Sequence, residues 1–234
     1  MVPRNGTIYY ELIMPYIDIM PTALYKGKLS QPLTTKQRVV LDYLKIHPNE
    51  LSKEMYLLDR EGFESLKEEV YTHIRKYEKD VCGFRDHVSL SITESWYRET
   101  VPNNNHAKHN HPNSLLSGCI YVQVPPQPSD AEIPNWDGEG HGGINLVHME
   151  SRGVFKNFNF EYDYKETKYN AKRTFLPVET GDIILFPSYI DHFVSYNLSQ
   201  ENISRKIISF NTFIEGNICL FNSFPNNLTL KHHD

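Results

Sequence analysis

The spacing of apolar side chains changes once, about a third of the way along the chain. Over residues 34–80 apolar residues recur every three or four positions, as on one face of an amphipathic helix. Val40 and Leu44 mark one such face, Leu66 and Val70 mark a second, and Lys and Glu fill the positions between. The pattern predicts helices laid against one side of a core. Strand and irregular segments are expected in the thirty residues before them.

From residue 88 onwards apolar and polar residues alternate, which is typical of a half-buried strand. Val88, Leu90 and Ile92 face one way, and hydroxyl-bearing residues stand between them. Further strands are predicted at residues 116–124, 143–149, 154–164, 182–186, 193–197 and 205–214. Helices followed by seven or eight strands predict an α+β protein. We expect a β-sandwich or jelly-roll barrel braced by N-terminal helices.

The 234 residues are enough for one sizeable core, and no domain boundary stands out. We expect a single domain in which residues 1–85 give strand and helical support and residues 86–214 form the β-barrel core. Residues 215–234 are expected to be a C-terminal tail. The turn-rich residues 125–143 are too long for a tight hairpin and predict either a lid or a disordered insert.

Charge and cysteine content narrow the possible functions. Lys and Arg total 24 against 29 Asp and Glu, a net charge of -5, so we expect no large nucleic-acid footprint. The three cysteines, Cys82, Cys119 and Cys219, form no CxxC pair, which argues against a disulfide framework or a zinc ribbon. A reducing cytoplasm is the expected location. The N-terminal residues resemble neither a signal peptide nor a membrane span.

Two histidines stand one residue apart, directly ahead of an apolar strand, in "KHNHPNSLLSGCIYVQVP". Residues i and i+2 of an extended chain face the same way, so His109 and His111 could converge on one metal ion. Pro112 favours an extended backbone at His111. His106 could substitute for either, although its expected loop position makes it the poorer candidate. Taken alone, the pair also fits solvated histidines in an Asn-rich loop.

A second segment, residues 176–213, adds a third histidine and a notable arginine. A Gly-Asp turn begins an apolar strand, and His192 opens the next one. Thirteen residues later Arg205 lies in an otherwise apolar strand, on the same face as Ser209 and Asn211. A guanidinium is costly to bury without an anion. Arg205 could therefore be a surface residue, pair with an internal acid, or grip a carboxylate ligand through two hydrogen bonds.

In combination these motifs resemble the 2-oxoglutarate/Fe(II)-dependent oxygenase superfamily, and within it a bacterial and phage subgroup with a His-x-His metal motif. The resemblance covers roughly residues 89–213. The residues that carry it are Trp96, His109-Asn110-His111, Ser117-Gly118, Tyr121, Gly181-Asp182, Phe186-Pro187-Ser188, His192, Arg205 and Ser209-Phe210-Asn211. It implies a double-stranded β-helix, the jelly-roll barrel expected from the strand pattern.

The resemblance also implies a metal site in which His109, His111 and His192 are the Fe(II) ligands and the catalytic centre. His111 takes the place of the carboxylate that the superfamily usually has. A neutral imidazole there leaves the iron centre one unit more positive. A rival register would use His111 with Asn113, although an amide is a poor iron ligand.

By the same resemblance Arg205 would bind the distal carboxylate of the cosubstrate 2-oxoglutarate, with Tyr121 and Ser209 as further partners. The implied reaction uses O2 and a primary substrate, and hydroxylation of a peptide side chain or a small molecule is expected. Trp136 in the 125–143 loop and the aromatic residues 155–169 could line the substrate cleft.

Two alternatives stay open at this point. A cupin-like three-His dioxygenase would not use 2-oxoglutarate, and its Arg205 would bind an anionic substrate. In a non-catalytic β-barrel binding module the three histidines need not converge at all.

Overall fold

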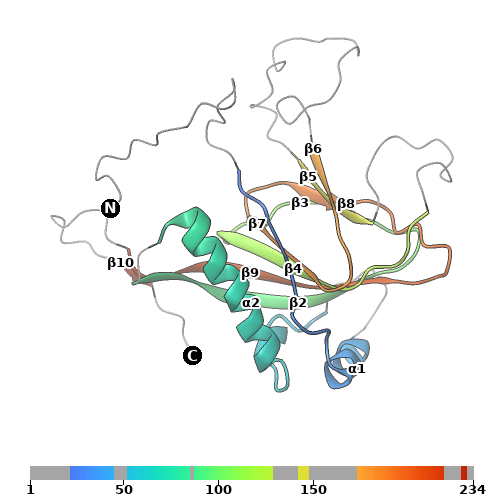
Figure 1. Cartoon of the computed structure of the whole chain (residues 1–234), viewed down its shortest axis with the longest axis horizontal. Helices are drawn as coiled ribbons and strands as arrows, with labels where there is room; N and C mark the ends of the chain where they lie inside the picture. The colour runs from blue at the N-terminus through green and yellow to red at the C-terminus, as the bar shows by residue number, and fades with distance from the viewer. Residues whose placement is uncertain are drawn as a thin grey trace, which may run out of the picture.

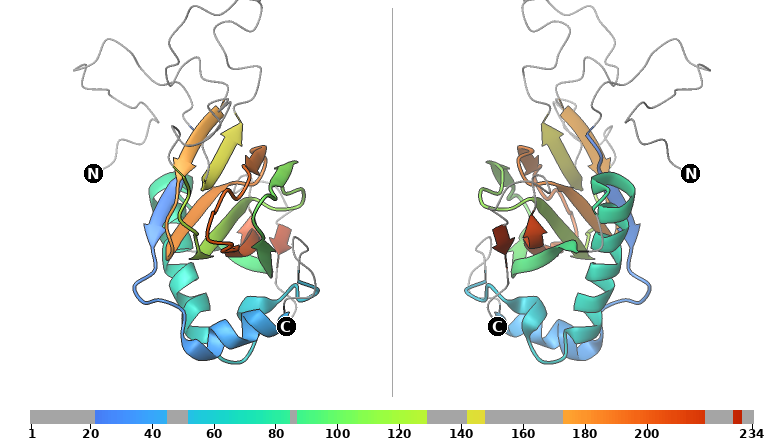
Figure 2. Two further views of the ribbon diagram at one scale, coloured as in Figure 1. Left: turned by 90° about the vertical axis from the view of Figure 1, so that its right-hand side faces the viewer. Right: turned by 90° about the vertical axis from the view of Figure 1, so that its left-hand side faces the viewer.

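The computed structural model describes residues 22–44, 52–84, 87–128, 142–147, 173–218 and 228–230, and the observations below concern those residues. Two antiparallel β-sheets are stacked on one another, and the helices lie outside the larger sheet (Figures 1 and 2). No ladder of hydrogen bonds joins the two sheets in the described part of the chain, so the jelly-roll barrel is open along its seams. The predicted fold class is confirmed.

The predicted helical region contains two α-helices. The helical elements are α1 (Thr35–Leu44), η1 (Leu57–Asp59), α2 (Glu64–Tyr77) and η2 (Glu78–Cys82). Helix α2 buries Leu66, Val70 and Ile74, the apolar stripe that the three-to-four-residue spacing predicted. Within the described residues no helix has both the length and the apolar character needed to cross a membrane.

The larger sheet has the order β1-β7-β4-β9-β10, and β2 also pairs with β9. Its strands are β1 (Tyr25–Lys28), β2 (Val88–Thr100), β4 (Leu116–Gln123), β7 (Asp182–Pro187), β9 (Arg205–Ile218) and β10 (Leu228–Leu230). The smaller sheet has the order β3-β8-β5-β6. Its strands are β3 (His106–His109), β5 (Gly143–Val147), β6 (Arg173–Pro177) and β8 (His192–Val194).

Most of the predicted strands are present, with three differences. Strand β8 begins at His192 and ends at Val194, so the prediction of residues 193–197 was wrong in extent. Three residues beyond its end, the buried Asn197 side chain donates to the carbonyls of Thr100 and Ile203. Strands β3, β6 and β10 were not predicted, and β9 runs past the expected end to Ile218. The strand predicted at residues 154–164 lies outside the described residues.

The larger sheet has two different faces. Its outer face packs Leu90, Ile120, Ile183, Ile208 and Phe210 against α1 and α2 in one apolar cluster. Its inner face belongs to a second cluster facing the smaller sheet, made of Cys119, Tyr121, Ile144, Leu146, Val178, Ile184, Phe186 and Ile190. Because side chains alternate along a strand, β4 and β9 contribute to both clusters. We call the region between this inner face and the smaller sheet the chamber.

The Ser-Gly and Gly-Asp motifs have structural roles in the larger sheet and no evident role in binding a ligand. A Cβ on Gly118 would clash with Phe210 and would come within 2.7 Å of Leu185 and 2.8 Å of the Ile184 carbonyl. Gly181 has a φ of 89°, a conformation that side chains other than glycine's disfavour. These positions explain the Ser-Gly and Gly-Asp pairs by packing and turn geometry.

Asp182, which follows Gly181, fastens β1 to β7. Its buried carboxylate pairs with Lys26 and Lys28, each at 3.1 Å, and accepts the Glu179 backbone N–H at 2.7 Å. Burial acts to raise the pKa of Asp182, but the Glu179 N–H and the two ammonium groups outweigh it, so the pKa is lowered. The carboxylate is therefore ionised at neutral pH and ties the edge strand to the sheet.

Candidate metal centre and cosubstrate pocket

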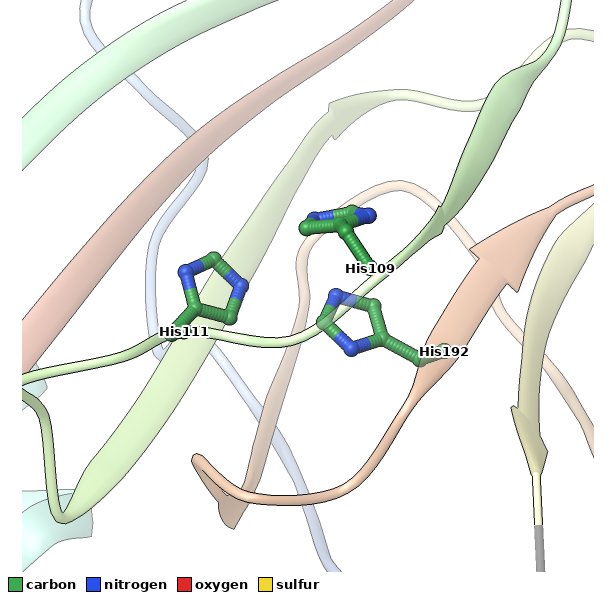
Figure 3. Close-up of side chains that lie close together, drawn as sticks. All are labelled: His109, His111 and His192. Carbon is green, nitrogen blue, oxygen red and sulfur yellow. The ribbon is translucent and has the colours of Figure 1, made fainter.

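Three histidine side chains lie close together, one from β3, one from the loop that follows it and one from β8 (Figure 3). His109 ends β3, His111 follows two residues later, and His192 begins β8 directly opposite His109 in the ladder. One ring nitrogen from each lies within 4.8 Å of the other two. The sequence-predicted triad is thus brought together by the pairing of β3 with β8, although the chain separates its members by some eighty residues.

Backbone carbonyls orient two of the rings. His109 Nδ1 lies 2.8 Å from the Ala107 carbonyl, and His192 Nδ1 lies 3.0 Å from the Ile190 carbonyl. A carbonyl oxygen only accepts, so each Nδ1 carries the proton and donates it. The Nε2 lone pair of each ring is then free for a metal, which is the usual arrangement around a ligating histidine.

Burial keeps two of the rings neutral. It lowers the pKa of His192 to about 3 and, helped by the neighbouring His109, lowers the pKa of His111 to about 4. Trp96 and Phe186 lie against the His111 ring at 5.9 and 6.2 Å between centroids. Neutral imidazoles with fixed orientation are ligands suited to Fe(II) and similar divalent metals. The donor set therefore fits the metal that the resemblance implies.

The rival register and the spare histidine have different outcomes. The rival register stays a prediction: Asn113 is an exposed turn residue with a φ of 64°, whereas the His111 ring is stacked on that of His192. His106 is not in a loop as expected but begins β3, with its ring centroid 4.2 Å from that of His109. Because β3 carries polar residues on both faces, no apolar alternation signalled it as a strand.

Arg205 lies deep in the chamber on β9 and is 3% exposed. Its Nη2 donates a single long hydrogen bond, 3.4 Å, to the Ser195 carbonyl. Burial lowers the pKa of Arg205 to about 10, which leaves it cationic at neutral pH. No acidic side chain in the described ranges pairs with it. Of the three readings that the sequence left open, a bound anion best suits a buried guanidinium that has no acidic partner among the described residues.

The two predicted partners of Arg205 share its face of the sheet. Tyr121 is 2% exposed and stands opposite Ile207, the second residue after Arg205. Burial raises the pKa of Tyr121 well above its usual value, so its hydroxyl is neutral and able to donate. Ser209 stands opposite Cys119 and Trp96, two positions further along β9. The structure therefore presents a cation and two hydroxyl groups along one side of the chamber.

Several motif residues form a network beneath His111 instead of pointing at a ligand. Ser117 Oγ lies 2.8 Å from Ser188 Oγ and donates to Asn211 Oδ1 at 2.9 Å, and Asn211 Nδ2 donates to Glu94 at 3.1 Å. The Ser188 carbonyl accepts the His111 backbone N–H at 3.0 Å. This network joins β2, β4, β7 and β9 and positions the loop that carries His111.

Sequence reasoning missed one residue of the chamber, Arg98, and placed a second, His106, in a loop. Arg98 of β2 stands opposite Ile207, on the same face as Trp96, and its Nε is buried without a hydrogen-bond partner. His106 lies close enough to Arg98 and Arg205 for both charges to act on it. The two-residue alternation from Trp96 to Arg98 was the signal that could have found the arginine. The substrate-cleft candidates Trp136 and residues 155–169 lie outside the described residues.

Comparison with known proteins agrees with this geometry. The family model described as "Putative 2OG-Fe(II) oxygenase" matches residues 94–211, just over half of the chain. No curated protein matches. Among solved structures, HygX from Streptomyces hygroscopicus, with nickel and 2-oxoglutarate bound, is similar at a TM-score of 0.50 with 12% identity, covering 82% of each chain. This likeness shows a shared fold.

Two other solved structures resemble the chain less well. A prolyl-4-hydroxylase from Pseudomonas putida has a TM-score of 0.48 with 10% identity, covering 81% of this chain and 92% of that one. A 2OG-Fe(II) oxygenase family oxidoreductase from Burkholderia pseudomallei has a TM-score of 0.46 with 13% identity, covering 80% and 84%.

Proposed function

The chain belongs to the 2OG-Fe(II) oxygenase family, and on that premise we propose that His109, His111 and His192 hold its Fe(II) while Arg205 anchors 2-oxoglutarate. Family membership makes the protein a 2-oxoglutarate-dependent oxygenase with Fe(II) as its metal. It separates the chain from the cupin-like and binding-module alternatives. The observation that carries the residue assignment is the convergence of three imidazole nitrogens within 4.8 Å.

With Fe(II) bound, the centre supplies the chemistry that converts 2-oxoglutarate and O2 into succinate and CO2 and transfers one oxygen atom to a substrate. His109 and His192 contribute Nε2 lone pairs whose direction is set by the carbonyls behind them. The Phe186 ring, 4.6 Å from the His192 ring, and the apolar inner cluster keep water from the site.

Arg205 grips the distal carboxylate of 2-oxoglutarate in this proposal. A guanidinium binds a carboxylate through two parallel N–H···O bonds, and its burial in a low-dielectric chamber strengthens the pair. The neutral Tyr121 hydroxyl donates a further hydrogen bond, and Ser209 completes the polar side of the pocket. A cosubstrate held in this way would have one carboxylate at Arg205 and would present its other end to the three histidines.

The finer reaction that we propose is hydroxylation of a peptide or protein side chain or of a small molecule. The acidic composition of the chain disfavours a nucleic-acid substrate. The proposed location is a reducing cytoplasm, which suits the free thiols of Cys82 and Cys119. Succinate release from candidate peptides and small molecules would identify the primary substrate.

The first test is an anaerobic titration of the protein with Fe(II), followed by 2-oxoglutarate. We expect one equivalent of Fe(II) to bind and a weak visible charge-transfer band to grow to saturation as the cosubstrate chelates the metal. Loss of a residue that supports a metal ligand weakens metal binding by about 10–100-fold. His192→Ala removes a proposed ligand itself and should weaken Fe(II) binding by more than that. His87→Ala, at an exposed histidine outside the chamber, is the matched control.

Arg205→Gln separates the cosubstrate site from the metal site. It should leave Fe(II) binding intact and weaken 2-oxoglutarate binding by about tenfold to 100-fold, because a hydrogen bond to a charged group is worth about 1.5–3 kcal/mol. The control is Lys206→Gln on the adjacent, outward position of β9, where Lys206 pairs with Asp42 at 2.7 Å. Undiminished Fe(II) binding in His192→Ala would remove the triad, and unchanged 2-oxoglutarate affinity in Arg205→Gln would remove the anchor.

A further inference from the structure

The chamber holds a second arginine that the proposed function does not use. Arg98 stands opposite Ile207 on β2, and Arg205 stands opposite Thr100, so the two arginines are diagonal neighbours on the inner face. Such neighbours are about 7–8 Å apart. Their proximity is supported by the effect of Arg98 on Arg205, whose pKa it lowers in addition to burial.

Arg98 has no acidic partner in the described residues. Its Nε is buried without a hydrogen-bond partner, and only burial, with no neighbouring carboxylate, shifts its pKa, downward. The one acid found on the inner face of β2, Glu94, lies four residues earlier, about 13 Å along a strand. Glu94 is engaged by Asn211 at 3.1 Å. The ring of His106 lies near Arg98 and, at 4.2 Å between centroids, near the ring of His109.

Charge counting shows that Fe(II) and 2-oxoglutarate leave the chamber positive. The three ligating imidazoles are neutral, so the metal keeps both positive charges, and Arg98 and Arg205 add one each. The two carboxylates of 2-oxoglutarate cancel two of these four. Two positive charges then remain among these groups, and holding them between the sheets is costly unless a further anion enters.

The two arginines differ in depth. Arg205 is 3% exposed at the far end of the chamber, whereas Arg98 is partly exposed. A cosubstrate that reaches Arg205 therefore leaves Arg98 on the side from which another molecule can arrive. The guanidinium fork suits a carboxylate or a phosphate equally.

We propose that Arg98 is the recognition group for an anionic primary substrate, one that places a carboxylate or phosphate beside the bound 2-oxoglutarate. This inference rests on the proposed function and deepens it by naming the substrate class. Arg98 is then a specificity-determining residue, and the excess positive charge of the three-histidine centre favours the same substrates.

The test uses the full chain loaded with Mn(II), which does not support turnover, and saturating 2-oxoglutarate. Calorimetry measures the binding of two probe anions, inorganic phosphate and N-acetylglycine, with N-acetylglycinamide as the uncharged control. We expect the wild type to bind one of the anions at a single site and not to bind the amide. Arg98→Gln should weaken that binding by about tenfold or more, and Arg98→Lys by less.

The same variants distinguish the second site from the cosubstrate site. Arg98→Gln should lower 2-oxoglutarate affinity less than Arg205→Gln, which should lower it by about tenfold or more, because Arg98 acts on the cosubstrate only through its charge and Arg205 through direct hydrogen bonds. Lys206→Gln should change neither.

Each outcome bears on the proposal. Phosphate or N-acetylglycine binding that depends on Arg98 supports it, and the anion that binds identifies the substrate's charged group. Absence of anion binding to the loaded wild type overturns it, and so does equal loss of 2-oxoglutarate affinity in Arg98→Gln and Arg205→Gln. A wild type that does not bind 2-oxoglutarate at all overturns the proposed function as well, and this result is separate from the other two.

Discussion

The two faces of the larger sheet are formed by the same strands, but the outer face stabilises the fold and the inner face carries the candidate site. On β9, Ile208 and Phe210 point outward and are fully buried under the helices. Arg205 and Ser209, their neighbours along the chain, point inward to the chamber. The outer face gains free energy by removing apolar surface from water. The inner face keeps two cations without acidic partners among the described residues.

This difference implies that two adjacent residues of one strand can have different roles, one in the stability of the fold and the other in ligand binding. A residue that points outward should matter for unfolding and only indirectly for ligands. A residue that points inward should matter for ligands and little for unfolding, since an unpaired buried charge destabilises the ligand-free protein. Four changes test this contrast, in order of decreasing effect on stability.

Phe210→Ala should have the largest effect. It deletes a fully buried ring from the outer cluster and should lower the free energy of unfolding by about 3–5 kcal/mol. Urea denaturation measures the change. Phe213→Ala, at a side chain that is 39% exposed on the same strand, is the control and should cost far less. Similar losses for both would mean that the outer face is not the main source of stability.

Gly118→Ala should come next, with a loss of about 1–3 kcal/mol from overpacking. The new methyl group would meet Phe210, Leu185 and the Ile184 backbone carbonyl, and a carbonyl in a sheet cannot move aside easily. Thermal denaturation provides the measurement. Gly181→Ala is the comparison, because its nearest neighbour is the flexible Lys28 at 3.4 Å and its cost comes from the φ of 89° alone. An unchanged melting temperature for Gly118→Ala would contradict the close packing of β4 on β9.

Asp182→Asn should lower stability by about 1–2 kcal/mol at neutral pH, because hydrogen bonds and ion pairs to a buried carboxylate are lost. The folded-state pKa of Asp182 is lowered, so its contribution is complete above the usual value of 3.8 and disappears as pH falls through the lowered value. The difference between wild type and variant should therefore be constant from pH 5 to 8 and shrink in stronger acid.

The matched control for Asp182 is Glu179→Gln. Glu179 pairs with the same Lys28, at 3.2 Å, but its side chain is 81% exposed, and an exposed ion pair contributes little. The free energy of unfolding of Glu179→Gln should be within about 0.5 kcal/mol of the wild-type value. A difference for Asp182→Asn that grows toward low pH would have the wrong sign for a lowered pKa.

Arg205→Met should have the smallest effect on the ligand-free protein, about 1 kcal/mol or less in either direction, since it removes a buried charge that lacks an acidic partner. Its effect should appear with ligand present. Saturating 2-oxoglutarate stabilises a protein that binds it, by about 2.7 kcal/mol at 100 times the dissociation constant. That increase should be present in the Mn(II)-loaded wild type and absent in the variant. A large loss of stability without ligand would mean that Arg205 is structural.

The sequence by itself determined the fold class and indicated the three histidines that the structure brings together. Apolar spacing of three to four and then of two residues reports which side chains meet a core, and that requirement is local to each element. His109, His111, His192 and Arg205 were recognisable because their order and spacing resemble a known family. Gly118 and Asp182 entered as part of the same motifs, although sequence alone did not assign them a structural role.

Only the tertiary structure decided which residues share the chamber. Strand pairing of β3 with β8 brings His109 opposite His192, and pairing of β2 with β9 brings Arg98 beside Arg205. Neither strand pairing could be predicted from the local hydrophobic pattern, because a short polar strand such as β3 shows no alternation of apolar and polar residues. The burial of Arg205, and the absence of an acidic partner for Arg98 among the described residues, likewise depend on how the two sheets stack. Whether a charged side chain is buried depends on the tertiary structure. The consequences of that burial for ligand binding could therefore be inferred only once the positions of the charges were known.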